Sequence, residues 1–261
     1  MSGNLSLRYP VILVHGIAAR DRGAIISFWG RVPEILEAQG AVVFLGNTDS
    51  WGSYESNAAL LHTTIEKVLR ETNTEKVNII AHSKGGIDSR YCIWKYNCAV
   101  ASLTTIATPH HGSEIADLLY RQKLVHTGIT RRTLRVFGKL YGDIHPDIYN
   151  LNYQLTTEQM KKFNENIPMD KKVYCQSMYT TMRNAWDDVM FFYSYRYLRG
   201  VAGENDGFVS ARSVQWGDAT VRIGSGISHA EITDFKKRTI SGIEIPDMYI
   251  HIVSGLGEMG F

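Results

Sequence analysis

Hydrophobic and polar positions follow two alternating patterns along the chain. Short apolar runs of strand length lie at residues 11–14, 41–45, 76–81 and 101–107. Most of these runs are rich in β-branched residues, as strands buried on both faces of a parallel sheet are. Longer segments of helical period separate them, so the chain is predicted to form an α/β fold with a largely parallel sheet.

Two helices are predicted with particular clarity. Between the second and third runs, apolar residues recur in steps of four, three, four and three, which places them on one face of a helix. They are Tyr54, Ala58, Leu61, Ile65 and Val68. Near the carboxyl terminus, Pro246 begins a second predicted helix, which Gly255 and Gly257 end.

The alternation breaks between Ser113 and about Lys171. Leu134, Phe137 and Tyr141 could share a helix face there, so we expect a helical insertion over the sheet. Apolar runs return at 172–175 and 197–202, which we interpret as further strands. The insertion therefore interrupts a single domain, residues 1–261, and does not begin a second one.

A candidate nucleophile lies directly after the third apolar run. The sequence from Ala81 to Gly86 reads Ala-His-Ser-Lys-Gly-Gly and precedes a helical segment. A strand, a tight turn and a helix form the context of a nucleophile elbow, whose strained turn needs small residues at positions such as Ala81 and Gly85. The alternative is that Ser83 only caps the helix, and the context favours the nucleophile.

A serine nucleophile needs a general base oriented by a carboxylate, and in this fold the acid and then the histidine follow the serine. Asp206 lies in a Gly-bounded loop just after the expected strand 198–202. His229 lies in a loop rich in Gly and Ser further on. We therefore predict Ser83, Asp206 and His229 as nucleophile, acid and base.

Rival residues have weaker contexts. His251 lies within the predicted closing helix, and His110 and His111 precede the acid, contrary to the expected order. The competing acids, Asp187, Asp188 and Asp218, do not combine a preceding apolar strand with a Gly-bounded loop. A plain turn at residues 205–207 remains an open alternative for the acid loop.

Ester hydrolysis passes through an oxyanion that needs preorganised N–H donors. One donor is expected from the backbone of Lys84, the residue after the nucleophile, and the other from Ile17, in the loop after the first strand. The alternative to an oxyanion loop at His15 and Gly16 is that these residues simply end the strand, with Gly16 as a turn glycine. We expect the Lys84 ammonium to point to solvent. The alternative is that it adds positive charge near the oxyanion site.

Composition narrows the classes of function. The 261 residues include 28 Lys plus Arg and 26 Asp plus Glu, a balance that disfavours nucleic-acid binding. No apolar run approaches the roughly 20 residues of a membrane span, and no signal peptide is evident in residues 1–10. We expect a cytoplasmic protein as the sequence stands, or a secreted one if a leader precedes it. The three cysteines have no metal-ligand spacing, and we expect buried free thiols.

Four stretches together resemble the family I bacterial triacylglycerol lipases of the α/β-hydrolase fold, of the Pseudomonas, Burkholderia and Proteus type. They are residues 9–16, the elbow, residues 107–113, and residues 205–210 with His229 downstream. The resemblance implies the same triad, and a mobile helical lid at about residues 113–171 over an acyl-binding cleft. The chain departs from the family's pattern at Ala81, where a glycine is usual, and at Lys84.

The resemblance also implies a structural calcium ion, held by an acidic residue before the catalytic acid and another two residues after the histidine. The corresponding candidates are Asp187 or Asp188 and Glu231, and carboxylate oxygens suit calcium. No cofactor is expected to be required for the chemistry itself. An acidic pair that is merely solvated is the alternative.

The predicted function is a serine carboxylester hydrolase. Its expected substrate is a lipid or another ester with a medium or long acyl chain. The substrate is either dispersed in water or bound at a lipid–water interface. The alternatives are an acyltransferase or thioesterase on the same fold, and a binding module that keeps the fold without chemistry. The candidate Ser, Asp and His residues count against the last alternative.

Overall fold

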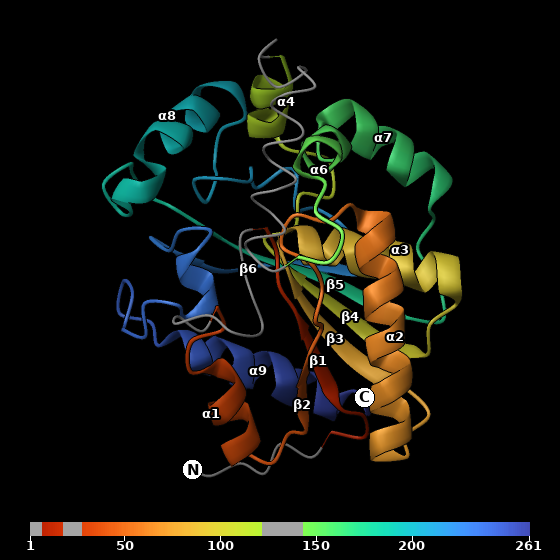
Figure 1. Ribbon diagram of the computed structural model, residues 1–261. Helices are drawn as coiled ribbons and strands as arrows, with labels where there is room; N and C mark the ends of the chain where they lie inside the picture. Colours follow the sequence, from red (N-terminus) through yellow and green to blue (C-terminus); the bar gives the residue numbers. More distant parts are fainter. Residues whose placement is uncertain (1–6, 18–27, 122–142) are drawn as a thin grey trace.

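The computed structural model describes residues 7–17, 28–121 and 143–261 (Figure 1). Within them, six parallel strands form one sheet in the order β2-β1-β3-β4-β5-β6. The strands are β1 (Val11–Val14), β2 (Val43–Leu45), β3 (Val77–His82), β4 (Val100–Ile106), β5 (Tyr174–Thr181) and β6 (Ala219–Ser225). The first four match the expected runs to within two residues, and the α/β fold is confirmed.

Helices cover both faces of this sheet (Figure 1). On one face lie α1 (Val32–Ala38) and α9 (Ile245–Glu258), which share an apolar cluster with Trp29 and β1. On the other lie α2 (Tyr54–Thr72) and α3 (Lys84–Tyr96). Both predicted helices, α2 and α9, are confirmed, and the expected apolar stripe of α2 is buried from Ala58 to Val68. The expected end of the second helix at Gly255 and Gly257 is wrong, because α9 continues through both glycines to Glu258.

The expected strand at 197–202 is wrong, because these residues belong to helix α8 (Phe192–Val201). Tyr195 and Leu198, three positions apart, are buried, whereas Arg196 and Arg199 are exposed. This spacing is that of an amphipathic helix. The sixth strand is instead β6, a half-exposed edge strand whose apolar positions are too sparse to stand out in the sequence.

Three helices of the 113–171 segment are described. They are α4 (Glu114–Arg121), α6 (Ile148–Gln154) and α7 (Thr157–Asn166), and they lie above the carboxyl ends of the strands (Figure 1). The predicted face of Leu134, Phe137 and Tyr141 lies outside the described residues. Ile87 of α3 packs in one apolar cluster with Ala116, Leu151 and Phe163, so these helices rest directly on the helix that follows the elbow.

The order of the strands determines where a site can form. β1 lies between β2 and β3, so the chain leaves β1 toward one edge of the sheet and returns on its other side. In open parallel sheets, ligands bind outside the carboxyl ends of the strands at such a switch point. Residues after β1 and β3 meet there. No helix in the described part of the chain has the length and apolar character to cross a bilayer.

Candidate active site

Ser83 lies in the sharp turn between β3 and α3 with a strained backbone. Its φ of 53° and ψ of −129° are unfavourable for a residue with a Cβ. The Ser83 N–H donates to Ile106 O at 2.8 Å, and Ser83 O accepts from Thr108 Oγ1 at 2.7 Å. The end of β4 thus holds the nucleophile turn in place.

The small residues of this turn are required by close contacts. A Cβ on Gly85 would lie 2.5 Å from His15 O and 2.6 Å from Val14 O, and a Cβ on Gly86 would lie 2.3 Å from Thr108 Oγ1. The glycines therefore let α3 begin directly against β1 and the loop after β4.

The structure brings Ser83, His229 and Asp206 together in one hydrogen-bonded chain. His229 Nε2 lies 2.9 Å from Ser83 Oγ, and His229 Nδ1 lies 2.7 Å from Asp206 Oδ2. All three side chains are buried. In the tautomer with Nδ1 protonated, the imidazole donates to the carboxylate and accepts from the hydroxyl, which is the geometry of a general base beside a nucleophile.

Asp206 is held by its own loop. Its Oδ1 accepts N–H groups from Phe208 at 2.9 Å and Val209 at 2.7 Å, and its backbone carbonyl accepts the N–H of His229 at 2.8 Å. The loop follows α8, not a strand. It nevertheless reaches the carboxyl end of β5, because Met182 N donates to Asn205 O at 2.9 Å.

The rival histidines have other roles. His251 is exposed on α9, with Nδ1 2.7 Å from Asp247 O. His110 is fully buried between Thr105 and Arg90. Neither contacts Ser83.

Each residue expected to supply an oxyanion donor follows a residue at the nucleophile turn: Ile17 follows Gly16, and Lys84 follows Ser83. Gly16, next to Ile17, lies so close that a Cβ on it would be 2.8 Å from Ser83 Cβ. The ring nitrogens of His15 lie 2.8 Å from Gly16 O and 3.1 Å from Thr48 O, which orients this loop. Lys84 follows Ser83 as the first residue of α3.

The expectation that the Lys84 ammonium points to solvent is wrong. The side chain is 2% exposed, and Nζ lies 2.5 Å from Asp88 Oδ1, one turn along α3. Burial raises the pKa of Asp88, while pairing with Lys84 acts in the opposite direction. The cation is buried because it pairs with a carboxylate four residues along the same helix, which is itself buried.

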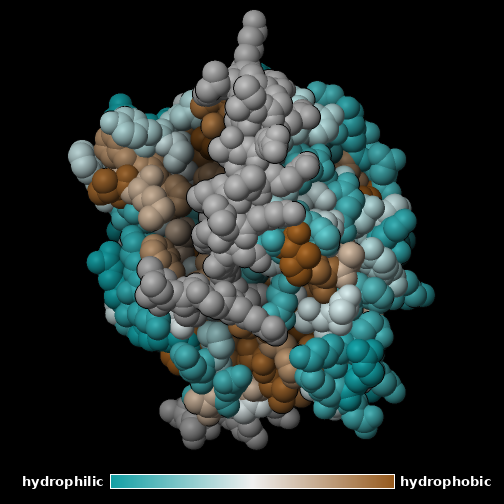
Figure 2. All heavy atoms as spheres, in the orientation of Figure 1, coloured by the Kyte–Doolittle hydropathy of each residue, from teal (hydrophilic) through white to brown (hydrophobic). Residues whose placement is uncertain are grey.

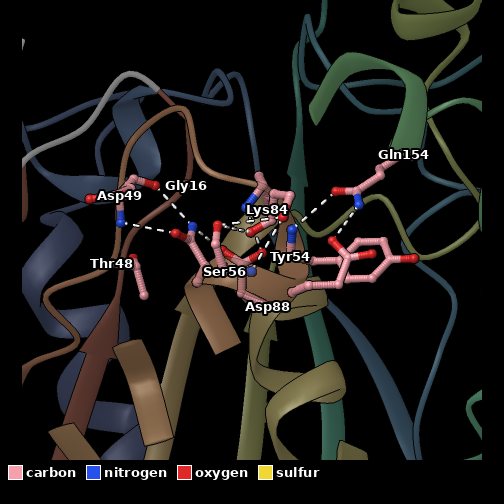
Figure 3. A network of polar contacts seen from close by, with 12 residues as sticks. Gly16, Thr48, Asp49, Tyr54, Ser56, Lys84, Asp88 and Gln154 are labelled. Atoms are coloured by element: carbon pink, nitrogen blue, oxygen red, sulfur yellow. Dashed lines mark hydrogen bonds and ion pairs between the residues drawn. The ribbon is translucent and has the colours of Figure 1, made fainter. Parts of the chain in front are cut away.

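This ion pair belongs to a polar network under the site (Figure 3). Asn57 Nδ2 donates to Asp88 Oδ2 at 2.8 Å and to Asp49 O at 2.9 Å. The Asp49 carboxylate accepts the N–H groups of residues 144 and 145, and Asp143 accepts those of residues 50 and 51. The network therefore joins the helix after the nucleophile to residues 143–145, which lie within the 113–171 insertion.

His82 lies beside the triad and was not identified from the sequence as a positioning residue. Its Nε2 lies 2.9 Å from His229 O, and its Nδ1 is buried without a hydrogen-bond partner in the described residues. Burial lowers the pKa of His82 well below its usual range, and the neighbouring His229 adds to the effect. A neutral His82 that donates from Nε2 fits this environment.

The three calcium candidates do not meet at one point. Asp188 and Glu231 approach each other beside the His229 loop, with the ammonium of Lys236 between them. Asp187 is turned away, and its carboxylate accepts the N–H of Arg183 at 2.5 Å. Nothing in the sequence around Lys236 marked it as a partner of these acids.

Comparisons of the chain with known proteins identify its family. Residues 55–191 match the family model described as lipase-like, C-terminal domain. A triacylglycerol lipase of Pseudarthrobacter phenanthrenivorans is 35% identical over 173 residues, which cover 62% of this chain and 54% of the relative. Triacylglycerol lipase 2 of Saccharomyces cerevisiae is 30% identical over 257 residues, covering 90% of this chain and 75% of the relative.

Among solved structures, the mature lipase BlEst2 of Bacillus licheniformis superposes with a TM-score of 0.71 at 22% identity, over 94% of this chain and 91% of that one. This likeness supports the α/β-hydrolase fold. The matched part spans about half the length of the bacterial relative named above.

Proposed function

Since the chain belongs to the triacylglycerol lipase family of the α/β-hydrolase fold, we propose that it hydrolyses carboxylic esters of lipids through an acyl-enzyme on Ser83. The observation that carries the proposal is the chain from Ser83 Oγ through His229 to Asp206, with separations of 2.9 and 2.7 Å. The names of the relatives support acylglycerols as the class of substrate.

In the first half-reaction, Ser83 Oγ attacks the acyl carbonyl while His229 Nε2 takes the hydroxyl proton. Asp206 stabilises the imidazolium that forms. The backbone N–H groups of Ile17 and Lys84 stabilise the oxyanion, a contribution of about 3 kcal/mol per donor. The intermediate collapses, and the alcohol leaves with the proton from His229. Water then attacks the acyl-enzyme by the same steps and releases the carboxylic acid.

Replacement of Ser83 by Ala tests the nucleophile. We expect Ser83→Ala to lose hydrolysis of p-nitrophenyl esters from acetate to palmitate, and to lose labelling by a fluorophosphonate probe, because both need the hydroxyl. The matched control is Ser254→Ala, at an exposed position of α9, which should keep both. Turnover retained in Ser83→Ala would remove the basis of the proposal.

We also propose that the protein binds a lipid surface through an exposed apolar segment. The segment from Trp186 to Tyr193 exposes apolar side chains, with Trp186 73%, Val189 69%, Met190 67% and Tyr193 85% exposed. Figure 2 shows apolar residues gathered at the upper left, where Figure 1 draws α8. Phe191, within the same segment, has its ring 6.5 Å from that of His229, so an ester surface bound here would lie beside the triad.

A pair of substrates separates surface binding from chemistry. We expect Val189→Ser combined with Met190→Ser to lower hydrolysis of emulsified triglyceride at least about tenfold, because burial of these two side chains in lipid contributes roughly 1.5–3 kcal/mol each. Hydrolysis of soluble p-nitrophenyl butyrate should stay near wild type. Val42→Ser, also exposed but at the amino end of β2, is the control. Equal loss on both substrates would contradict surface binding.

A further inference from the structure

A cluster of charged side chains lies behind the loop that carries His229. Asp188 directly precedes the short helix η2 (Val189–Phe191), and Glu231 begins η3 (Glu231–Thr233). Both residues are almost fully buried, at 6% and 1% exposed. Two acids buried side by side need a cation, because an uncompensated buried charge is strongly destabilising.

Lys236 supplies that cation. Its Nζ lies 3.1 Å from Asp188 Oδ2 and 2.7 Å from Glu231 Oε1. Burial opposes charge on Asp188, but the hydrogen bonds from Ser228 and Lys236 outweigh it and hold the pKa of this carboxyl below its usual range. Arg238 is the next cation, 3.8 Å from Glu231 and well exposed.

The same two carboxylates fix the backbone on both sides of His229. Ser228 N donates to Glu231 Oε2 at 3.1 Å, and Ser228 Oγ donates to Asp188 Oδ2 at 2.7 Å. Glu231 N in turn donates to Ser228 Oγ at 3.3 Å. The catalytic histidine lies between Ser228 and Glu231, so the position of its ring depends on how firmly this cluster holds the turn.

These residues do not fit the calcium ion that the family resemblance implies. Calcium takes six to eight oxygen ligands at 2.3–2.6 Å, whereas the space between Asp188 and Glu231 holds an ammonium group. The third candidate, Asp187, is bound to Arg183 and Asn184 instead. Within the described residues, no group of three or more His, Cys, Asp or Glu side chains is arranged to hold a metal.

We infer that Lys236 is a built-in cation that takes the place of a structural metal ion and positions His229 through Glu231, Ser228 and Asp188. The ammonium and a calcium ion would occupy the same space, so the chain holds its histidine loop without metal. The kinetic consequence rests on the proposed function, while the structural consequence rests on the contacts alone.

Thermal unfolding with EDTA or with CaCl₂ tests whether Lys236 takes the place of a structural metal ion. We expect the Tm of the wild type to be the same in both. Lys236→Ala should lower Tm by about 5 °C or more, and CaCl₂ should raise the Tm of this variant, because two facing carboxylates then lack a cation. Lys236→Arg should restore most of the loss. Lys237→Ala, at the exposed neighbouring position, is the control and should change nothing.

Kinetics on p-nitrophenyl butyrate test whether Lys236 positions His229. Lys236→Ala should lower kcat at least about tenfold with KM nearly unchanged, because a displaced imidazole slows proton transfer without altering the acyl site. Two results would overturn the inference: a wild-type Tm that falls in EDTA and recovers with CaCl₂, or a Lys236→Ala variant with wild-type Tm and kcat. Activity retained in Ser83→Ala would instead refute the proposed function and leave the Tm comparison valid.

Discussion

At the scale of single residues, the elbow depends on the absence of a side chain at Gly85. We expect Gly85→Ala to lower the free energy of unfolding by about 2 kcal/mol or more, because the new methyl group would meet the carbonyl oxygens of Val14 and His15 at 2.6 and 2.5 Å. These are backbone atoms of β1 and its end, which cannot rotate away. Urea unfolding measures the loss.

Gly255 gives the matched control for this substitution. It lies inside α9, and a Cβ there would meet nothing within 4 Å. Gly255→Ala should therefore stabilise the protein by roughly 0.5–1 kcal/mol through its helical preference. If both variants shifted stability in the same direction and by similar amounts, close packing of the elbow against β1 would not be the reason for Gly85.

At the scale of one element, α3 joins the nucleophile to a buried ion pair. Lys84→Met should cost about 3–5 kcal/mol of unfolding free energy, because it leaves the carboxylate of Asp88 buried without its cation. The backbone N–H proposed for the oxyanion hole is unchanged by this substitution. Urea unfolding at neutral pH measures the cost.

The double variant Lys84→Met with Asp88→Asn separates charge from packing. Removal of the second charge should recover much of the lost stability, since the amide can still accept from Asn57. A double variant as unstable as Lys84→Met alone would mean that the lysine stem, and not the pairing of charges, stabilises the start of α3.

The same helix shows how far sequence reasoning reaches. Ser83, Asp206 and His229 could be chosen from the sequence because each lies in a turn with local signals, and the fold imposes their order. One signal for Asp206 is wrong, since the strand expected before it is helix α8. The direction of the Lys84 side chain could not be predicted, because it depends on the burial of Asp88 and on the contact of Asp88 with Asn57 from α2. The apolar run at 197–202 does not reveal its own structure, because a short apolar stretch fits a strand and a helix equally well. Lys236 acts only through contacts across loops, which no local pattern predicts.

At the scale of the whole molecule, buried neutral histidines couple stability to pH. Burial lowers the pKa of His82 and of His110 well below its usual range, with further repulsion from His229 and Arg90 respectively. A histidine of usual pKa, about 6.5, takes up a proton in the unfolded chain as pH falls, while these two stay neutral in the fold. Their stabilising contribution is thus fully present above pH 6.5 and is lost below it.

We therefore expect the free energy of unfolding to fall between pH 7.5 and pH 5.5 by about 1.4 kcal/mol for each of these two histidines. Urea unfolding of His110→Gln at both pH values should show a fall smaller by that amount, because the glutamine does not titrate. His251→Gln removes an exposed histidine and should keep the wild-type fall. Equal pH dependence in the two variants would mean that His110 takes up its proton in the folded state, in spite of its burial against Arg90.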